Sequence, residues 1–141
     1  MVFPDVNVLV YAHREESAHH AACYAWLERT LKAEQAFALS ELVLSSVVRI
    51  ITHPRIFTPP TPLDRALAFT SRLLTEEHAV VVAPGARHWD LFGRLCREVD
   101  GRGNLVTDAY LAAIAIESGC ELISTDGDFA RFPDLKWRRP F

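Results

Sequence analysis

Apolar and polar positions follow two patterns along this chain: short apolar runs, and longer segments whose apolar residues repeat about every 3.6 positions. The short runs predict strands and the longer segments predict helices. The predicted strands are residues 2–4, 36–39, 79–83, 121–125 and a segment near 135–137. The predicted helices are residues 7–12, 18–34, 41–51, 61–76, 89–99 and 106–116. This alternation predicts an α/β fold, with a parallel sheet covered by helices on both faces.

The segment 106–116 differs from the other predicted helices because it is apolar on almost every side. A helix of this kind must be buried, so we expect it to pack against the centre of the sheet. Thr107 is a suitable N-cap and would place Asp108 in the first turn, where the helix dipole favours a negative charge. A capping acid is the common explanation for such a residue, and a metal ligand is the other.

Two further helix starts are predicted from similar residues. Ser40 is expected to cap a helix that carries Glu41 in its first turn, and Thr61 to cap the next helix with Pro62 as its first helical residue.

Three aromatic residues could stack on bases, but their helix or strand positions favour packing in the core: Trp26, Trp89 and Trp137.

Four acids occupy equivalent positions in this predicted topology. They stand just after a strand or at the start of the next helix: Asp5, Glu41, Asp108 and Asp126. Strand carboxyl ends and the following helix N-termini share one edge of a parallel sheet, so these carboxylates should converge. Asn7 and Asp128 would stand next to them. We expect Asp128 only to support the group, because Asp-Gly-Asp is also a common turn sequence.

Several carboxylates in one place repel each other unless a proton or a cation relieves the repulsion. Oxygen ligands without a His or Cys partner suit a hard cation such as Mg²⁺ or Mn²⁺. A carboxylate cluster that holds one or two such ions is suited to in-line phosphoryl chemistry. The four acids therefore predict a metal centre of this type.

Composition narrows the function further. The 141 residues are half apolar, which predicts one domain over residues 1–141. A net charge of −3 argues against binding nucleic acid through a broad basic surface, although bound cations would reverse the local sign. Three isolated cysteines favour a reducing cytoplasm over a disulfide framework. We expect neither a signal peptide nor a membrane span.

Several stretches, spread over nearly the whole chain, together resemble the PIN-domain ribonucleases, and in particular the VapC-type toxins of bacterial toxin–antitoxin pairs. The matching stretches are residues 4–12 (PDVNVLVYA), Glu41 in its apolar helix, residues 49–55 (RIITHPR), residues 107–115 (TDAYLAAIA) and residues 124–129 (STDGDF). Val6 departs from the wider family, where a small hydroxylated residue often stands at that position.

The resemblance implies a three-layer α/β/α fold with a central, mainly parallel sheet. It implies that Mg²⁺ or Mn²⁺ is bound by Asp5, Glu41, Asp108 and Asp126, with Asn7 and Thr125 as polar support. The implied activity is metal-dependent endonucleolytic cleavage of RNA. The implied partners are a second copy of the chain, forming a homodimer, and a VapB-type antitoxin that blocks the site.

Two alternatives remain open. A haloacid-dehalogenase-like phosphatase also places an Asp after its first strand, but it needs a second Asp where Asn7 stands and a downstream Lys in a chain that contains only Lys32 and Lys136. A non-catalytic PIN-like scaffold that only binds RNA or a partner would be expected to have lost one of the acids. A serine hydrolase is disfavoured because Ser124 lacks a GxSxG setting and a paired His.

Overall fold

The computed structural model describes all 141 residues and contains one five-stranded sheet in the order β3-β2-β1-β4-β5. The strands are β1 (Val2–Pro4), β2 (Phe37–Leu39), β3 (Ala79–Val81), β4 (Glu121–Ile123) and β5 (Trp137–Arg138). Every neighbouring pair is parallel, as the alternation of strands and helices predicted. The third and fourth strands are shorter than predicted, ending at Val81 and Ile123 rather than at residues 83 and 125.

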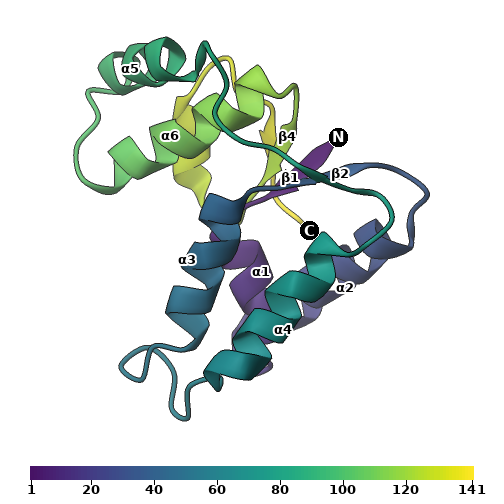
Figure 1. Cartoon of the computed structure of the whole chain (residues 1–141). Helices are drawn as coiled ribbons and strands as arrows, with labels where there is room; N and C mark the ends of the chain where they lie inside the picture. Colours follow the sequence, from purple (N-terminus) through teal and green to yellow (C-terminus); the bar gives the residue numbers. More distant parts are fainter.

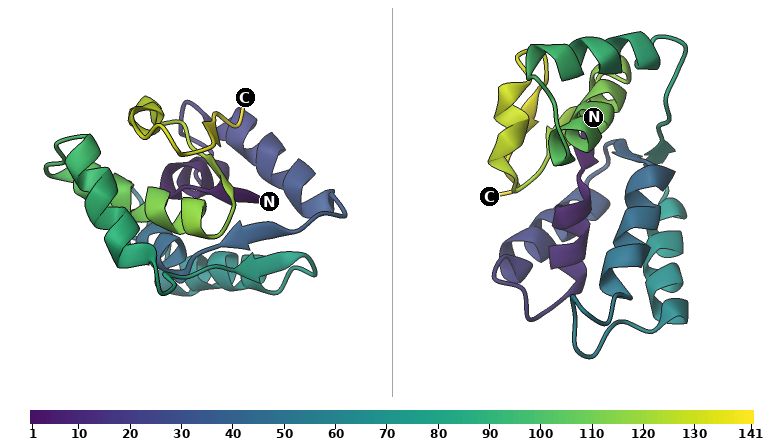
Figure 2. Two further views of the ribbon diagram at one scale, coloured as in Figure 1. Left: turned by 90° about the horizontal axis from the view of Figure 1, so that it is seen from above. Right: turned by 90° about the vertical axis from the view of Figure 1, so that its left-hand side faces the viewer.

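Six α-helices and one 3₁₀ helix connect the strands. They are α1 (Val6–His13), α2 (His20–Lys32), α3 (Glu41–Ile51), α4 (Leu63–Leu74), α5 (His88–Glu98), α6 (Asn104–Glu117) and the 3₁₀ helix η1 (Gly127–Arg131). Helices α5 and α6 lie on one side of the strands, and α1 to α4 lie on the other (Figure 1). The right-hand view in Figure 2 shows the same separation. The predicted three-layer α/β/α fold is therefore confirmed.

Helix α6 and strand β1 form the buried centre of the molecule. Ala109 and residues 111–115 of α6 are buried, and the helix packs on β4 and α5. Strand β1 lies between β2 and β4, and its Phe3 is fully buried. The prediction that the apolar helix is buried is confirmed. Asp5 and Asp108 therefore extend from two well-packed elements.

The predicted start of α6 is wrong. The helix begins at Asn104, and its N-cap is Gly103, which has a φ of 55°. Thr107 therefore does not cap the helix, and Asp108 lies beyond its first turn. Residues 104–106 contain no Gly or Pro that would stop a helix, whereas Gly103 adopts the left-handed conformation easily and ends the preceding loop there.

Two other predicted caps differ in detail. Pro62, rather than Thr61, holds the N-cap position of α4, and the Thr61 hydroxyl accepts a hydrogen bond from Arg14 at 3.0 Å. Ser40 does stand at the N-cap of α3, but its side chain makes no capping hydrogen bond. In both cases a tertiary contact or burial takes precedence over the local capping preference.

The prediction that Trp89 packs in the core is also wrong. Trp26 is only 4% exposed, as expected, but Trp89 is 71% exposed. Helix α5 packs on α6, and only two of its residues, His88 and Leu95, are buried. An outer helix of this kind leaves much of its circumference in solvent, and Trp89 lies on that part.

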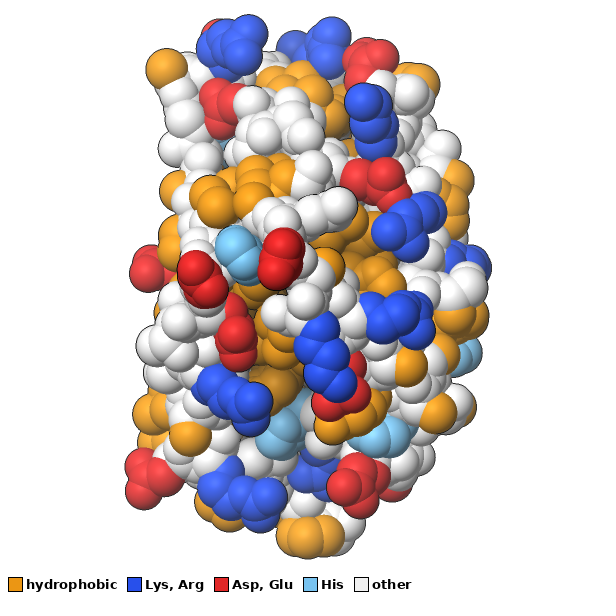
Figure 3. Space-filling model, turned by 90° about the vertical axis from the view of Figure 1, so that its right-hand side faces the viewer, with side chains coloured by type: hydrophobic (Ala, Val, Ile, Leu, Met, Phe, Trp, Pro, Cys, Tyr) orange, Lys and Arg blue, Asp and Glu red, His pale blue; other side chains and the backbone are white.

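The surface does not concentrate positive charge on the face drawn in Figure 3. There, basic and acidic side chains are interspersed with apolar ones. This mixture agrees with the net charge of −3. None of the helices combines the length and the apolar character that a membrane-spanning segment requires.

Candidate metal centre

Asp5 is held rigidly at the junction between β1 and α1. Its backbone N–H donates to the carbonyl of Ile123 at 2.8 Å, which ties it to the end of β4. Its carboxylate caps α1, since Oδ1 accepts from the Val6 N–H at 2.7 Å. The other oxygen, Oδ2, accepts from the Ser124 hydroxyl at 2.7 Å, and the residue is only 8% exposed. Both carboxylate oxygens of Asp5 are therefore oriented by donors.

Ser124 connects the ends of the two central strands. It is fully buried directly after β4. Besides donating to Asp5, its Oγ accepts from the Asp126 N–H at 3.0 Å and from Asn7 Nδ2 at 3.4 Å. Asn7 Oδ1 in turn accepts from the Thr125 N–H at 3.4 Å. The first turn of α1 and the loop after β4 thus form one hydrogen-bonded network around Asp5.

Three carboxylates meet next to this network. Asp108 on α6, together with Asp126 and Asp128 at η1, can each place one oxygen within 4.8 Å of the others. We call these three residues the acid cluster. Asp126 caps η1, and its Oδ1 accepts from the Asp128 N–H at 2.9 Å, so the two acids share one tight turn.

The electrostatics of the site disfavour full ionisation without a cation. Burial raises the pKa of Asp5 above its ordinary value; the hydrogen bonds from Ser124 and Val6 oppose this, and the charge of Asp126 adds to it. Burial also raises the pKa of Asp108 to about 6, with further contributions from the charges of Asp126, Asp5 and Asp128. A divalent cation among these oxygens would relieve the repulsion, and an all-oxygen donor set suits Mg²⁺ or Mn²⁺.

Glu41 lies at the same sheet edge but outside the acid cluster. It begins α3, directly after Ser40 and β2, and β2 is a direct neighbour of β1. Its side chain is exposed and makes no hydrogen bond or ion pair within the chain. Glu41 is therefore free to turn toward a ligand, whereas Asp5 is fixed in place.

Comparison with known proteins identifies the family. Residues 2–135 match the family described as PIN domain. Over 140 residues the chain is 41% identical to ribonuclease VapC25 and 40% identical to ribonuclease VapC31, both from Mycobacterium tuberculosis, with 99% of each chain covered. The chain belongs to the VapC family of PIN-domain ribonucleases. The resemblance inferred from the sequence motifs is confirmed.

Solved structures agree on the fold of this PIN domain. The structure of VapBC2 from Rickettsia felis, bound to a DNA fragment from their promoter, has a TM-score of 0.72 at 20% identity and covers 99% of this chain and 98% of that one. Mycobacterium tuberculosis VapC20, a Sarcin-Ricin loop cleaving toxin, has a TM-score of 0.69 at 16% identity and covers 96% and 99%. At these identities the likeness supports the architecture.

Sequence reasoning missed the part that Ser124 plays in this PIN domain. It assigned polar support to Thr125, whose backbone N–H and carbonyl are used but whose hydroxyl makes no hydrogen bond. The strand register carried the missing signal. Pro4 at the end of β1 pairs with Ile123 at the end of β4, so the next residues, Asp5 and Ser124, lie side by side. Asp128, expected outside the ligand group, has its carboxylate in the acid cluster.

Proposed function

We propose that this PIN domain is a Mg²⁺- or Mn²⁺-dependent endoribonuclease that acts as the toxin of a VapBC-type toxin–antitoxin pair. The observation that carries the proposal is the acid cluster, Asp108, Asp126 and Asp128, with oxygens within 4.8 Å of one another beside the buried Asp5. Holding three acids this close, beside a fourth, is costly unless a cation compensates the charge. Hydrolysis of RNA is the reaction for which the relatives are named.

The residues of the site would have two roles, as metal ligands and as residues that orient those ligands. Asp5, Asp108 and Asp126 would ligate the cation, and Asp128 and Glu41 would complete the set directly or through water. A bound divalent ion activates water and stabilises charge on the leaving oxygen. Ser124 and Asn7, through the hydrogen bonds described above, keep the Asp5 carboxylate oriented. In-line attack would leave a 3′-hydroxyl and a 5′-phosphate.

Arginines on the surface would contact the RNA backbone. Arg14 is unavailable for this, because it pairs with Glu16 and donates to Thr61 and to the Pro59 carbonyl at 2.9 Å. Arg102 lies in the loop just before α6, and its only ion pair, with Asp100, is exposed. Exposed pairs are weak, so Arg102 can exchange this partner for a phosphate at little cost.

The proposed partners are a VapB-type antitoxin and a second copy of the chain. VapBC complexes from Rickettsia felis and Haemophilus influenzae share this fold. For the homodimer, α4 exposes the apolar side chains of Leu63 and Leu67. The sheet-edge strand β3, which α4 contacts, exposes Val80 and Val81. A second copy would cover these apolar side chains.

We also propose that residues 1–141 form one domain and that the protein acts in the cytoplasm.

The alternatives have less support. In a dehalogenase-like phosphatase the position of Asn7 would carry a second acid. Here it carries an amide whose Nδ2 donates to the Ser124 hydroxyl and whose Oδ1 accepts from the Thr125 N–H. A scaffold that only binds RNA or a partner would have no need for the complete set of acids. A phosphoenzyme trapped on Asp5 would support the phosphatase.

The test is cleavage of structured RNA by purified protein in Mn²⁺ or Mg²⁺. Asp5→Asn and Asp108→Asn should both lose cleavage, and a chelator should abolish cleavage by the parent protein. Asp134→Asn is the matched control, because Asp134 is an exposed acid paired only with Arg94. If Asp5→Asn and Asp108→Asn cut as fast as the parent, the mechanism is wrong.

The toxin role has a separate test in cells. Expression of the chain alone should slow growth, and co-expression of the gene next to it should restore growth. Normal growth during expression of a cleavage-competent protein would contradict the toxin role and leave the nuclease activity standing. Sequencing the RNA ends after brief expression would identify the substrate.

A further inference from the structure

The C-terminal segment runs along the loop that carries Asp126. Strand β5 pairs with β4, and beyond β4 the Ser124 N–H donates to the Arg138 carbonyl at 3.2 Å. Two side chains of the segment then bind consecutive carbonyls of the loop. Trp137 Nε1 donates to the Ser124 carbonyl at 3.3 Å, and Arg139 Nη1 donates to the Thr125 carbonyl at 2.7 Å. Both acceptors immediately precede Asp126.

Arg139 lies against the turn between Asp126 and Asp128. Its Nη2 would be 3.6 Å from a Cβ placed on Gly127, so the guanidinium covers this side of the turn. On the inner side of the turn, Ser124 Oγ accepts a hydrogen bond from the Asp126 N–H, and Asp126 Oδ1 accepts one from the Asp128 N–H. Arg139 is thus the outer support of a turn whose two carboxylates belong to the acid cluster.

The segment around Arg139 is anchored on both sides. Before it, Trp137 and Arg138 belong to β5; after it, Pro140 is buried, and the Phe141 ring stacks on His19 with centroids 5.3 Å apart. These contacts fix the backbone of Arg139. The fixed backbone keeps the guanidinium close to the Thr125 carbonyl that it binds.

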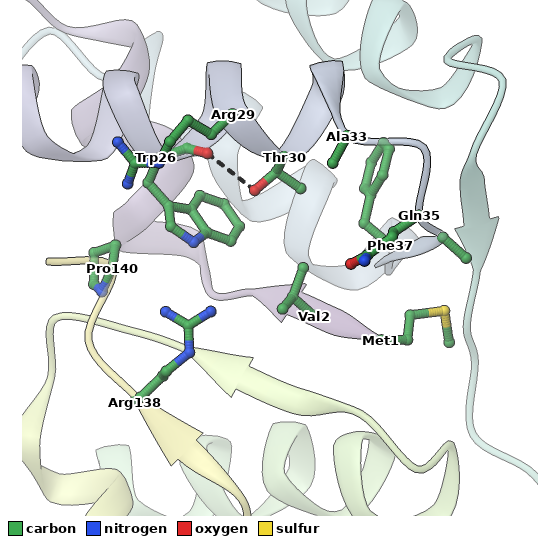
Figure 4. Close-up of a pocket in the computed structure, with 11 residues that line it drawn as sticks. Met1, Val2, Trp26, Arg29, Thr30, Ala33, Gln35, Phe37, Arg138 and Pro140 are labelled. Atoms are coloured by element: carbon green, nitrogen blue, oxygen red, sulfur yellow. Dashed lines mark hydrogen bonds between the residues drawn. The ribbon is translucent and has the colours of Figure 1, made fainter.

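Arg138 points in a different direction and provides an internal comparison. Figure 4 shows its guanidinium directed toward Trp26 of α2, in a pocket of about 600 Å³ that Arg29 and Pro140 also line. Arg138 pairs with Glu121 and donates to the Arg139 carbonyl at 3.4 Å, and its side chain makes no hydrogen bond or ion pair with the Asp126 loop. The two neighbouring arginines carry the same charge, but only Arg139 holds the loop.

We propose that Arg139 is a positioning residue for the metal centre. It binds neither cation nor RNA; it holds the Thr125 carbonyl and thereby fixes the turn that presents the carboxylates of Asp126 and Asp128. This inference rests on the proposed metal-dependent function. Loss of a residue that orients metal ligands from outside the coordination shell typically lowers metal affinity or activity by about 10- to 100-fold.

The experiment measures Mn²⁺ binding by calorimetry on the full chain and on three variants. Arg139→Ala should bind Mn²⁺ about tenfold more weakly than the parent. Arg139→Lys should retain most of the affinity, because an ammonium can donate to the same carbonyl. Arg138→Ala, the matched control, should bind like the parent. Circular dichroism verifies that each variant is folded.

Amide hydrogen exchange in the metal-free protein provides the second readout. The N–H groups of Asp126 and Asp128 should exchange about tenfold faster in Arg139→Ala, because local opening of the turn becomes easier, and no faster in Arg138→Ala. This readout is independent of metal and of RNA. If the parent binds no Mn²⁺, the proposed function fails, while the exchange rates still decide the role of Arg139.

Three results would overturn the inference. The first is parent-like exchange at Asp126 and Asp128 in Arg139→Ala. The second is an equal loss of Mn²⁺ affinity in Arg138→Ala, which would indicate a general effect of positive charge. The third is faster exchange with unchanged Mn²⁺ affinity, which would show that the turn does not govern the metal centre.

Discussion

Removal of the Ser124 hydroxyl tests how the centre is held together. Ser124→Ala deletes the 2.7 Å hydrogen bond to the Asp5 carboxylate and leaves the Asp126 N–H and Asn7 Nδ2 without their acceptor. A hydrogen bond to a charged group is worth about 1.5–3 kcal/mol, and Ser124 is fully buried, so water does not easily replace it. We expect the free energy of unfolding at pH 7 to fall by about 2 kcal/mol.

The pH dependence of this loss follows from the pKa of Asp5. Burial already raises that pKa, and the Ser124 hydrogen bond lowers it, so Ser124→Ala raises the Asp5 pKa further. A carboxyl whose pKa is higher in the folded than in the unfolded state makes the fold less stable as pH rises from the unfolded pKa through the folded one. The variant should therefore lose more stability at neutral pH than at a pH well below 3.8, where Asp5 is protonated in both states.

Urea unfolding of the metal-free protein over a pH series measures both effects. Ser45→Ala is the matched control, because Ser45 is an exposed hydroxyl whose only hydrogen bond is to the Leu42 carbonyl of its own helix. The control should unfold like the parent at every pH. A loss for Ser124→Ala below about 0.5 kcal/mol, or one that does not change with pH, would refute the role assigned to this hydroxyl.

Three further predictions concern single side chains. Asp108→Asn should stabilise the metal-free protein at pH 7 by about 1 kcal/mol after allowance for solvent screening, and should reduce the fall in stability between the unfolded pKa and about 6; denaturant unfolding at pH 4 and pH 7 measures this. Glu41→Gln should leave the melting temperature unchanged, because Glu41 has no partner in the chain, while RNA cleavage falls about tenfold; undiminished cleavage would remove Glu41 from the ligand set. Trp26→Ala should cost about 3–5 kcal/mol and Trp89→Ala less than about 1 kcal/mol by chemical denaturation, and a reversed order would contradict the burial of these residues.

The fold was predictable because its signals are local. The apolar runs, the alternation of strands with helices and the all-apolar helix that became α6 each depend on short stretches of sequence, and each prediction is confirmed. The start of α6 was not predictable from the capping preference of Thr107. The conformation of Gly103 and the helical continuation through residues 104–106 decided it.

The site was only partly predictable for a related reason. The convergence expected of Asp5, Glu41, Asp108 and Asp126 follows from sheet topology. The structure brings Asp108 and Asp126 together beside Asp5 and leaves Glu41 outside the acid cluster. The role of Ser124 depends on the register of β1 against β4, which joins positions far apart in the chain. The contribution of Asp128 depends on a tight turn that aims its carboxylate inward. Side-chain direction and register arise only in the folded chain.

The most direct test of the metal centre is a crystal structure of the protein soaked in Mn²⁺, with data collected for anomalous scattering from manganese. The proposed centre predicts an anomalous peak bonded to carboxylate oxygens of Asp5, Asp108 and Asp126 at about 2.1 Å, a typical distance for a small hard cation. The peak should vanish in Asp108→Asn. An anomalous peak elsewhere, or none at these acids at saturating Mn²⁺, would contradict the proposed centre.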